Sequence, residues 1–134
     1  MIFRLYDNKD LIRIMSPYLP LEGFDPDTWL EYEKNIALID ENDNLSLFEY
    51  NLPGVYTGHW FYKARGKEAI RVANEMLGEI FSDKYDVKII RGLTPLQNLG
   101  ARWLAKRVGF KPSGVTHTKA GPCELFILNK NEVR

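Results

Sequence analysis

The stretch Gly54–Ile70, "GVYTGHWFYKARGKEAI", contains two kinds of pattern separated by a charged loop. Residues 55–62 are rich in aromatic and β-branched side chains, which is typical of a strand. After the loop, apolar residues recur at helical spacing and predict a long amphipathic helix with one buried face: Ala69, Ile70, Ala73, Leu77, Ile80 and Phe81. A further strand follows at residues 86–93. A strand, a crossover helix and a second strand predict a parallel pair.

The segments on either side of this unit extend the alternation of strands and helices. Residues 36–40 and 45–50 read as strands joined by the turn "ENDN", and with residues 55–62 they predict three consecutive antiparallel strands. Further strands are expected at residues 2–6, 113–117 and 123–129. We therefore expect a mixed α/β (α+β) fold in one domain spanning residues 1–134, with a mostly antiparallel central sheet.

Two helices are expected near the N-terminus. Asp7 is suited to cap a helix over residues 8–15, which Pro17 would stop. A second short helix is expected over residues 24–35, with Asp25 as its cap and Pro26 at its first position. Both helices precede the first long strand pair.

A third helix is expected within residues 94–114, "TPLQNLGARWLAKRVGFKPSG". Thr94 and Gln97 have the spacing of a capping box, and Pro95 suits a first helical position. Gly109 is placed to end the helix. The apolar positions predict one buried stripe: Leu96, Leu99, Trp103, Leu104 and Val108.

Composition limits the classes of function. The chain has 134 residues, of which 45% are apolar and 27% charged, and no apolar run is long enough to span a bilayer. Eighteen basic and eighteen acidic residues cancel, so a general cationic field for nucleic acid is not expected. Cys123 is the single cysteine, which excludes an internal disulfide and suggests a cytoplasmic location.

The element order, with "YKARGKEAI" and "NLGARWLAKRVGF" at two strand-to-helix junctions, resembles the GCN5-related N-acetyltransferase (GNAT) family. The resemblance covers nearly the whole chain. It implies an acyl-CoA N-acyltransferase fold in which the parallel strands splay apart at the site of acetyl-CoA, the acyl donor. It also implies transfer of an acetyl group to a primary amine of a small molecule or protein, with no metal and no membrane.

The resemblance also implies the residues that hold acetyl-CoA. In the family, a loop of the form Q/R-x-x-G-x-G/A binds the pyrophosphate with backbone amides. Gly66 matches this motif, Lys63 replaces its first residue and Glu68 its last. Glu68 either complements the helix dipole or repels a phosphate. The residues expected to bind the cofactor are Trp60, Phe61, Lys63, Ala64, Arg65, Gly66, Lys67, Glu68, Ala69 and Asn98.

The second junction carries both a match and a departure. Asn98, Ala101, Gly109 and Phe110 have the family's N-x-x-A and G-F spacing, which implies that Asn98 helps to hold the pantetheine arm. The alternative is a surface amide near a helix start. Many family members have a tyrosine seven residues after the asparagine, which protonates the leaving thiolate. This chain has Ala105 there, so Tyr62, Tyr56, water or no group at all would have to serve.

Catalysis would also require a base, because an amine with a pKa near ~10 is protonated at neutral pH. His59 is the first candidate, on the strand before the loop, and Glu49 on the preceding strand is the second. The alternatives are that His59 is a hydrogen-bonded sheet residue and that Glu49 faces water. The predicted catalytic residues are thus His59 and Tyr62.

Other polar groups allow further readings. His117 and Cys123 raise the idea of a thiol or metal site, but their spacing matches no metal motif, which favours a core cysteine. An acidic group favours a cationic acceptor or is only a solvated face: Glu22, Asp25, Asp27, Glu31 and Glu33. The sequence also resembles compact GNAT-like proteins of bacteriophages. That resemblance implies an alternative, a catalytically inactive module in head assembly that would bind a protein partner through Arg102, Lys106 and Arg107.

Overall fold

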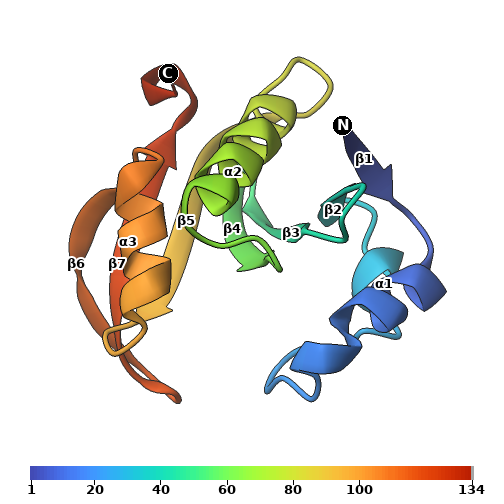
Figure 1. Ribbon diagram of the computed structural model, residues 1–134, viewed down its shortest axis with the longest axis horizontal. Helices are drawn as coiled ribbons and strands as arrows, with labels where there is room; N and C mark the ends of the chain where they lie inside the picture. The colour runs from blue at the N-terminus through green and yellow to red at the C-terminus, as the bar shows by residue number, and fades with distance from the viewer. Residues whose placement is uncertain (134) are drawn as a thin grey trace.

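The computed structural model describes residues 1–133, which form a seven-stranded sheet with helices on both faces (Figure 1). The strands have the order β1-β2-β3-β4-β5-β7-β6. Their bounds are β1 Ile2–Leu5, β2 Ile36–Asp40, β3 Leu45–Leu52, β4 Gly54–Phe61, β5 Val87–Pro95, β6 Lys111–Thr118 and β7 Gly121–Asn129. The α-helices are α1 Asn8–Met15, α2 Gly66–Ile80 and α3 Leu99–Arg107, and short 3-10 helices lie at Ser16–Tyr18, Trp29–Glu31 and Lys130–Glu132.

The alternation of side chains in β2 and β3 divides the apolar core into two parts. Ile36 and Leu38 pack on the face covered by α2 and α3, together with Phe48. Ala37 and Ile39 point to the opposite face, where α1 covers them. All five residues of β2 are buried, so this strand is covered on both sides. Burial of each large apolar side chain contributes about 1.5–3 kcal/mol, which makes these two layers the main source of stability.

The predicted parallel pair is confirmed, and it is the one parallel pairing among the strand pairs of residues 1–133. β4 and β5 pair from Gly54↔Val87 to Thr57↔Arg91, while every other neighbouring pair is antiparallel. The helix α2 forms the crossover between them and lies across the sheet (Figure 1). Its predicted buried face is also confirmed, except that Ile70 is only half-buried.

The first helix follows its prediction and the second does not. Asp7 caps α1 by accepting a hydrogen bond from the Lys9 amide, and α1 ends at Met15. In residues 24–35 the structure has only turns and the 3-10 helix Trp29–Glu31, so the expectation of an α-helix there is wrong. Asp25 binds the Asp27 amide within a turn rather than starting a helix. This local side-chain bond competes with the helical alternative.

The predicted start of the third helix is also wrong. Thr94 and Pro95 belong to β5, where they pair with Glu124 and Cys123 of β7, and the helix α3 begins only at Leu99. Strand pairing with β7 from Ile89 to Pro95 therefore overrides the local capping-box signal. The buried stripe is wrong in part, because Leu99 and Trp103 are 70% and 45% exposed, while Leu104 and Val108 do pack against the core.

No helix within residues 1–133 combines the length and the apolar character that crossing a membrane requires.

Candidate active site

The site lies where β4 and β5 separate. Their parallel pairing stops at Thr57↔Arg91, yet β4 continues to Phe61 and β5 to Pro95. Each strand keeps its other neighbour over this length, since Phe61 pairs with Leu45 and Pro95 with Cys123. The backbone groups that face the gap therefore have no strand partner across it. Ligands in α/β sheets bind at this kind of position, beyond the carboxyl ends of parallel strands.

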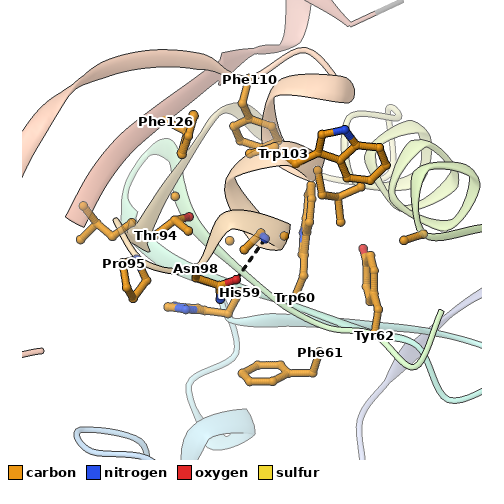
Figure 2. A pocket seen from close by; sticks show the side chains of 18 of the residues that line it. His59, Trp60, Phe61, Tyr62, Thr94, Pro95, Asn98, Trp103, Phe110 and Phe126 are labelled. Carbon is orange, nitrogen blue, oxygen red and sulfur yellow. Dashed lines mark hydrogen bonds between the residues drawn. The ribbon is translucent and has the colours of Figure 1, made fainter. Parts of the chain in front are cut away.

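A cleft of about 720 Å³ opens at this gap. Its lining comes from the ends of β4 and β5, the start of α2, α3 and the segment after α1. Figure 2 shows the side chains of Trp60, at the end of β4, and of Tyr62, just after β4, on the same side of the sheet, while Phe61 points to the opposite face. The lining of the cleft is largely apolar with a few polar side chains, as in most small-molecule sites.

The cleft brings together seven of the ten residues predicted to bind the cofactor. These are Trp60, Phe61, Ala64, Arg65, Gly66, Ala69 and Asn98. Lys63, Lys67 and Glu68 are exposed and do not line the cleft. His59 and Tyr62, the two predicted catalytic residues, both line it.

The loop between β4 and α2 has backbone amides of two kinds. Those of Lys63 and Ala64 both donate to the Asn44 side-chain oxygen, at 2.8 and 3.0 Å. Those in the first turn of α2 have no preceding helical carbonyl to bond, and no side chain caps this helix. Gly66 begins the turn with a φ of +59°, a left-handed conformation that suits glycine. These features make the start of α2 fit an anionic group.

The charges around this turn are only partly neutralised. Arg65 donates to the carbonyl oxygens of Tyr62 and Ala64 and bears no ion pair within the described residues. Lys63 lies 3.9 Å from Asp43. Glu68 pairs with Arg71 one turn along α2, and this hydrogen bond lowers the pKa of the Glu68 carboxyl. The carboxylate is therefore held by a cation on the helix surface, which weakens its repulsion of a phosphate.

Asn98 has a structural task that the sequence did not reveal. Its side-chain oxygen accepts a hydrogen bond from the Ala101 amide at 3.1 Å, so it caps α3 (dashed line in Figure 2). The oxygen has a second lone pair and the side-chain nitrogen two N–H groups, which leaves capacity for a ligand. Asn98 thus fits both alternatives that the sequence left open.

His59 has a partner on the neighbouring strand. Its Nε2 lies 3.2 Å from Glu49 Oε1, and both side chains are exposed. The hydrogen bond from His59 lowers the pKa of the Glu49 carboxyl. A histidine held by a carboxylate at the edge of a cleft is a suitable proton acceptor.

Tyr62 and Tyr56 differ in access to the cleft. The Tyr62 hydroxyl lies 2.7 Å from Ser46 Oγ, and burial raises its pKa well above the usual value for tyrosine. Loss of its proton is therefore less favourable than for an exposed tyrosine. Tyr56 does not line the cleft and packs edge-on against Tyr50. Ala105 lines the cleft and is buried, so the position that is tyrosine in many family members faces the site without a hydroxyl.

The alternative sites have less support. Within residues 1–133, no group of three metal-binding side chains lies close enough to hold an ion. Cys123 is buried and contacts Thr118 Oγ1, in keeping with a core cysteine. The basic surface predicted from Arg102, Lys106 and Arg107 has less free positive charge than expected. Arg102 donates to Glu124 Oε1 at 3.0 Å and to the Leu96 carbonyl oxygen.

Several lining residues were not predicted as site residues. Leu93 and Thr94 belong to the separated end of β5, Arg91 is the last β5 residue that pairs with β4, and Trp103 belongs to α3. Tyr18 reaches the cleft from the 3-10 helix after α1 and packs against Phe61. The parallel-pair prediction alone would have indicated β5, because both strands of a splayed pair line the gap. Trp103 carried no such signal, since its helical spacing indicated the core.

The structure resembles solved acetyltransferases over nearly its whole length. A spermidine N-acetyltransferase chimera from Vibrio cholerae and hSSAT has a TM-score of 0.72 and 16% identity, covering 98% of this chain and 95% of that one. Aminoglycoside acetyltransferase AAC(6')-Ib in complex with coenzyme A has a TM-score of 0.71 and 13% identity, covering 98% and 96%. A GNAT-family acetyltransferase from Bacillus anthracis has a TM-score of 0.67 and 14% identity, covering 98% and 96%.

The sequence itself matches no protein-family model and no curated protein. None of the three structures named above supports the prediction of a bacteriophage origin or of head assembly. Their agreement with this chain lies in the arrangement of helices and strands. The chain therefore has the fold of the GCN5-related N-acetyltransferases, as its two junction motifs suggested.

Proposed function

We propose that the protein is an acetyl-CoA-dependent N-acetyltransferase that acts on a primary amine. The separation of β4 and β5 beside the uncapped start of α2 supports this proposal most strongly, because it places a narrow apolar cleft next to a turn that suits phosphate. An acyl-CoA has this combination of parts, with a largely apolar thioester arm joined to a pyrophosphate.

The residues present fit such a ligand. The pyrophosphate would lie at Gly66, with Arg65 and Lys67 as the nearby cations. The pantetheine arm would follow the gap between β4 and β5 and meet Asn98, whose side chain still has donors to offer. Trp60, Ala105 and Phe110 all line the cleft, and the Trp60 ring packs edge-on against Phe110. Trp60 would therefore form a wall of the cleft beside Ala105.

The reaction forms a bond between the amine nitrogen and the acetyl carbon and breaks the bond from that carbon to sulfur. A protonated amine must lose one proton before attack, and His59 would accept it with Glu49 as its hydrogen-bond partner. The nitrogen loses a second proton as the amide forms, and the departing sulfur takes up one proton to give the free thiol of coenzyme A. The thiolate can leave without an acid, because a thiol has a pKa near ~8.5; the buried hydroxyl of Tyr62, predicted as a catalytic group, is the candidate proton donor of this chain.

The acceptor would enter beside the segment that follows α1. Tyr18 and Leu21 of this segment line the cleft, and the acidic residues expected to attract a cationic amine are exposed in the same region: Glu22, Asp25, Asp27, Glu31 and Glu33. Two of the similar structures are named as acetyltransferases of spermidine and of aminoglycosides. We therefore propose a small cationic amine as the acceptor.

Calorimetric titration with acetyl-CoA and coenzyme A tests the proposal. We expect micromolar affinity in the wild type and a loss of at least tenfold in Gly66→Glu, which places a carboxylate at the phosphate turn. An acceptor screen with His59→Ala then tests catalysis. Absence of binding at millimolar ligand would contradict the proposal and leave the non-catalytic module as the function to examine.

A further inference from the structure

The start of the cofactor loop is held by a buried side chain from a distant turn. Asn44 lies between β2 and β3 and is 2% exposed. Its Oδ1 accepts hydrogen bonds from the amides of Lys63 and Ala64, at 2.8 and 3.0 Å. One side chain thus fixes two consecutive peptide groups at the point where β4 ends.

The orientation of Asn44 is itself determined by Asp40. The side-chain Nδ2 of Asn44 donates to Asp40 Oδ2 at 3.0 Å, and the backbone N–H of Asn44 donates to Asp40 Oδ1 at 3.0 Å. Asp40 is 4% exposed and also binds the Asn42 amide. If the side-chain amide of Asn44 were rotated by half a turn, its oxygen would face the Asp40 carboxylate and its N–H groups would face the backbone N–H groups of Lys63 and Ala64. The observed orientation is therefore the only one in which all these groups are bonded.

The loop is divided by this arrangement into two functional parts. The Lys63 and Ala64 amides are consumed by Asn44, and the Tyr62 and Ala64 carbonyl oxygens accept from Arg65. The next hydrogen bond along the chain runs from the Ala69 amide to the Arg65 carbonyl oxygen, as in a regular helix. The four amides between them, at residues 65–68, are those left for an anion.

We propose that Asn44 is a positioning residue for the phosphate end of the acyl-CoA site. It orders residues 63 and 64 in advance and restricts phosphate contacts to the amides of residues 65–68, instead of the whole loop from Lys63 to Ala69. This inference rests on the proposed binding of acyl-CoA. A loop ordered before binding does not lose its backbone entropy on binding, and that entropy is large enough to change affinity by roughly tenfold or more.

Amide hydrogen exchange measured by NMR in the wild type tests whether the loop has these two groups of amides, and it requires no variant. We expect the amides of Lys63 and Ala64 to be protected and those of residues 65–68 to exchange rapidly. Titration with coenzyme A should protect the second group and leave the first unchanged. Equal exchange at all six positions before titration, or protection of Lys63 and Ala64 only after it, would overturn the proposal.

Variants then test the effect on binding. Asn44→Ala should weaken coenzyme A binding at least tenfold, while the dissociation constant of pantetheine, which has no phosphate, should stay unchanged. Asn42→Ala is the matched control, because Asn42 lies in the same turn and its exposed side chain makes no hydrogen bond within the described residues. Parallel loss of both ligands would indicate a merely structural role and overturn the positioning role.

Failure of this inference differs from failure of the proposed function. A wild-type protein that binds neither coenzyme A nor pyrophosphate contradicts the function itself, and the positioning role with it. Wild-type binding of coenzyme A that survives in folded Asn44→Ala contradicts the positioning role alone.

Discussion

His59 Nε2 and Glu49 Oε1 lie 3.2 Å apart on adjacent strands, at the edge of the cleft between β4 and β5. Two side chains that the sequence suggested as competing bases are therefore one hydrogen-bonded pair. The carboxylate can orient the imidazole, so that proton transfer and orientation are divided between the two residues.

The first prediction concerns this pair. Glu49→Gln should lower kcat roughly 3- to 10-fold and leave the KM for acetyl-CoA unchanged, because the amide still orients His59 but carries no charge. His59→Ala should lower kcat by at least 100-fold at neutral pH. Steady-state rates with a small polyamine acceptor would measure both. Equal activity of wild type and His59→Ala would exclude His59 as the base.

The same pair gives a pH dependence of stability with a defined sign. The pKa of Glu49 is lowered in the folded protein by the hydrogen bond from His59. The stability that the Glu49 carboxylate contributes is therefore present at pH values above its unfolded pKa of 4.5 and is lost as the pH falls through its folded pKa. Both side chains are nearly half exposed, so the pair contributes little. We therefore expect the free energies of unfolding of wild type and Glu49→Gln to differ by less than ~1 kcal/mol at pH 6 and to be equal at pH 2–3. Urea unfolding at the two pH values measures it.

A second prediction concerns Tyr62 and Ser46, whose hydroxyl oxygens lie 2.7 Å apart in the core. Tyr62→Phe should lower the free energy of unfolding by about 1–2 kcal/mol, since it leaves Ser46 Oγ buried without this partner. The double variant with Ser46→Ala should lose less than the sum of the two single variants. Additive losses would show that the two hydroxyls do not interact.

Tyr62 also has a pH signature. Its pKa is raised in the folded state by burial, so the stability it contributes is complete below the unfolded value of 10.0 and declines as the pH rises above it. We therefore expect Tyr62 to add no alkaline limb to the pH–rate profile below pH 10. A limb near pH 9 that disappears in Tyr62→Phe would show that the hydroxyl acts as a proton donor.

The sequence was informative where short-range patterns decide the structure. The parallel pair, the crossover helix α2 and the Asp7 cap of α1 all follow from periodicity and from residues within a few positions of each other. The start of α3 did not follow, because the extension of β5 to Pro95 depends on pairing with Cys123 of β7. The capping-box pattern at Thr94 contains no information about that distant strand.

The site shows the same limit. The place of Gly66 in the loop followed from the resemblance to the family motif, and that of His59 from its position on the strand before the loop. The contact of Asn44 with the amides of Lys63 and Ala64 could not, because it joins residues about twenty positions apart through a side chain. Tertiary contacts between a turn and a loop have no periodic signal in a single sequence.

A third prediction separates the two tasks of Asn98. Asn98→Ala should lower the free energy of unfolding by about 1 kcal/mol, because the Ala101 amide loses its cap. Asn98→Ser retains a capping oxygen and should keep most of this stability, but it lacks the side-chain N–H groups proposed to meet the pantetheine arm. We therefore expect weaker acetyl-CoA binding in both variants and lower stability in Asn98→Ala only. Unaltered binding in folded Asn98→Ser would restrict Asn98 to its capping task.

The last prediction compares two glycines of α2 that both have open space around them. A Cβ at Gly66 or Gly78 would meet no atom within 4 Å, so any difference between their alanine variants comes from the backbone. Gly66 has a φ of +59°, and alanine there should cost about 1–2 kcal/mol. Gly78 lies inside the helix, and alanine there should stabilise the protein by about 0.5–1 kcal/mol. Thermal unfolding of the two variants should therefore shift in opposite directions. A gain of stability in Gly66→Ala would mean that the turn at the proposed phosphate site does not hold the left-handed conformation, and the amides of residues 65–68 would then not be presented as proposed.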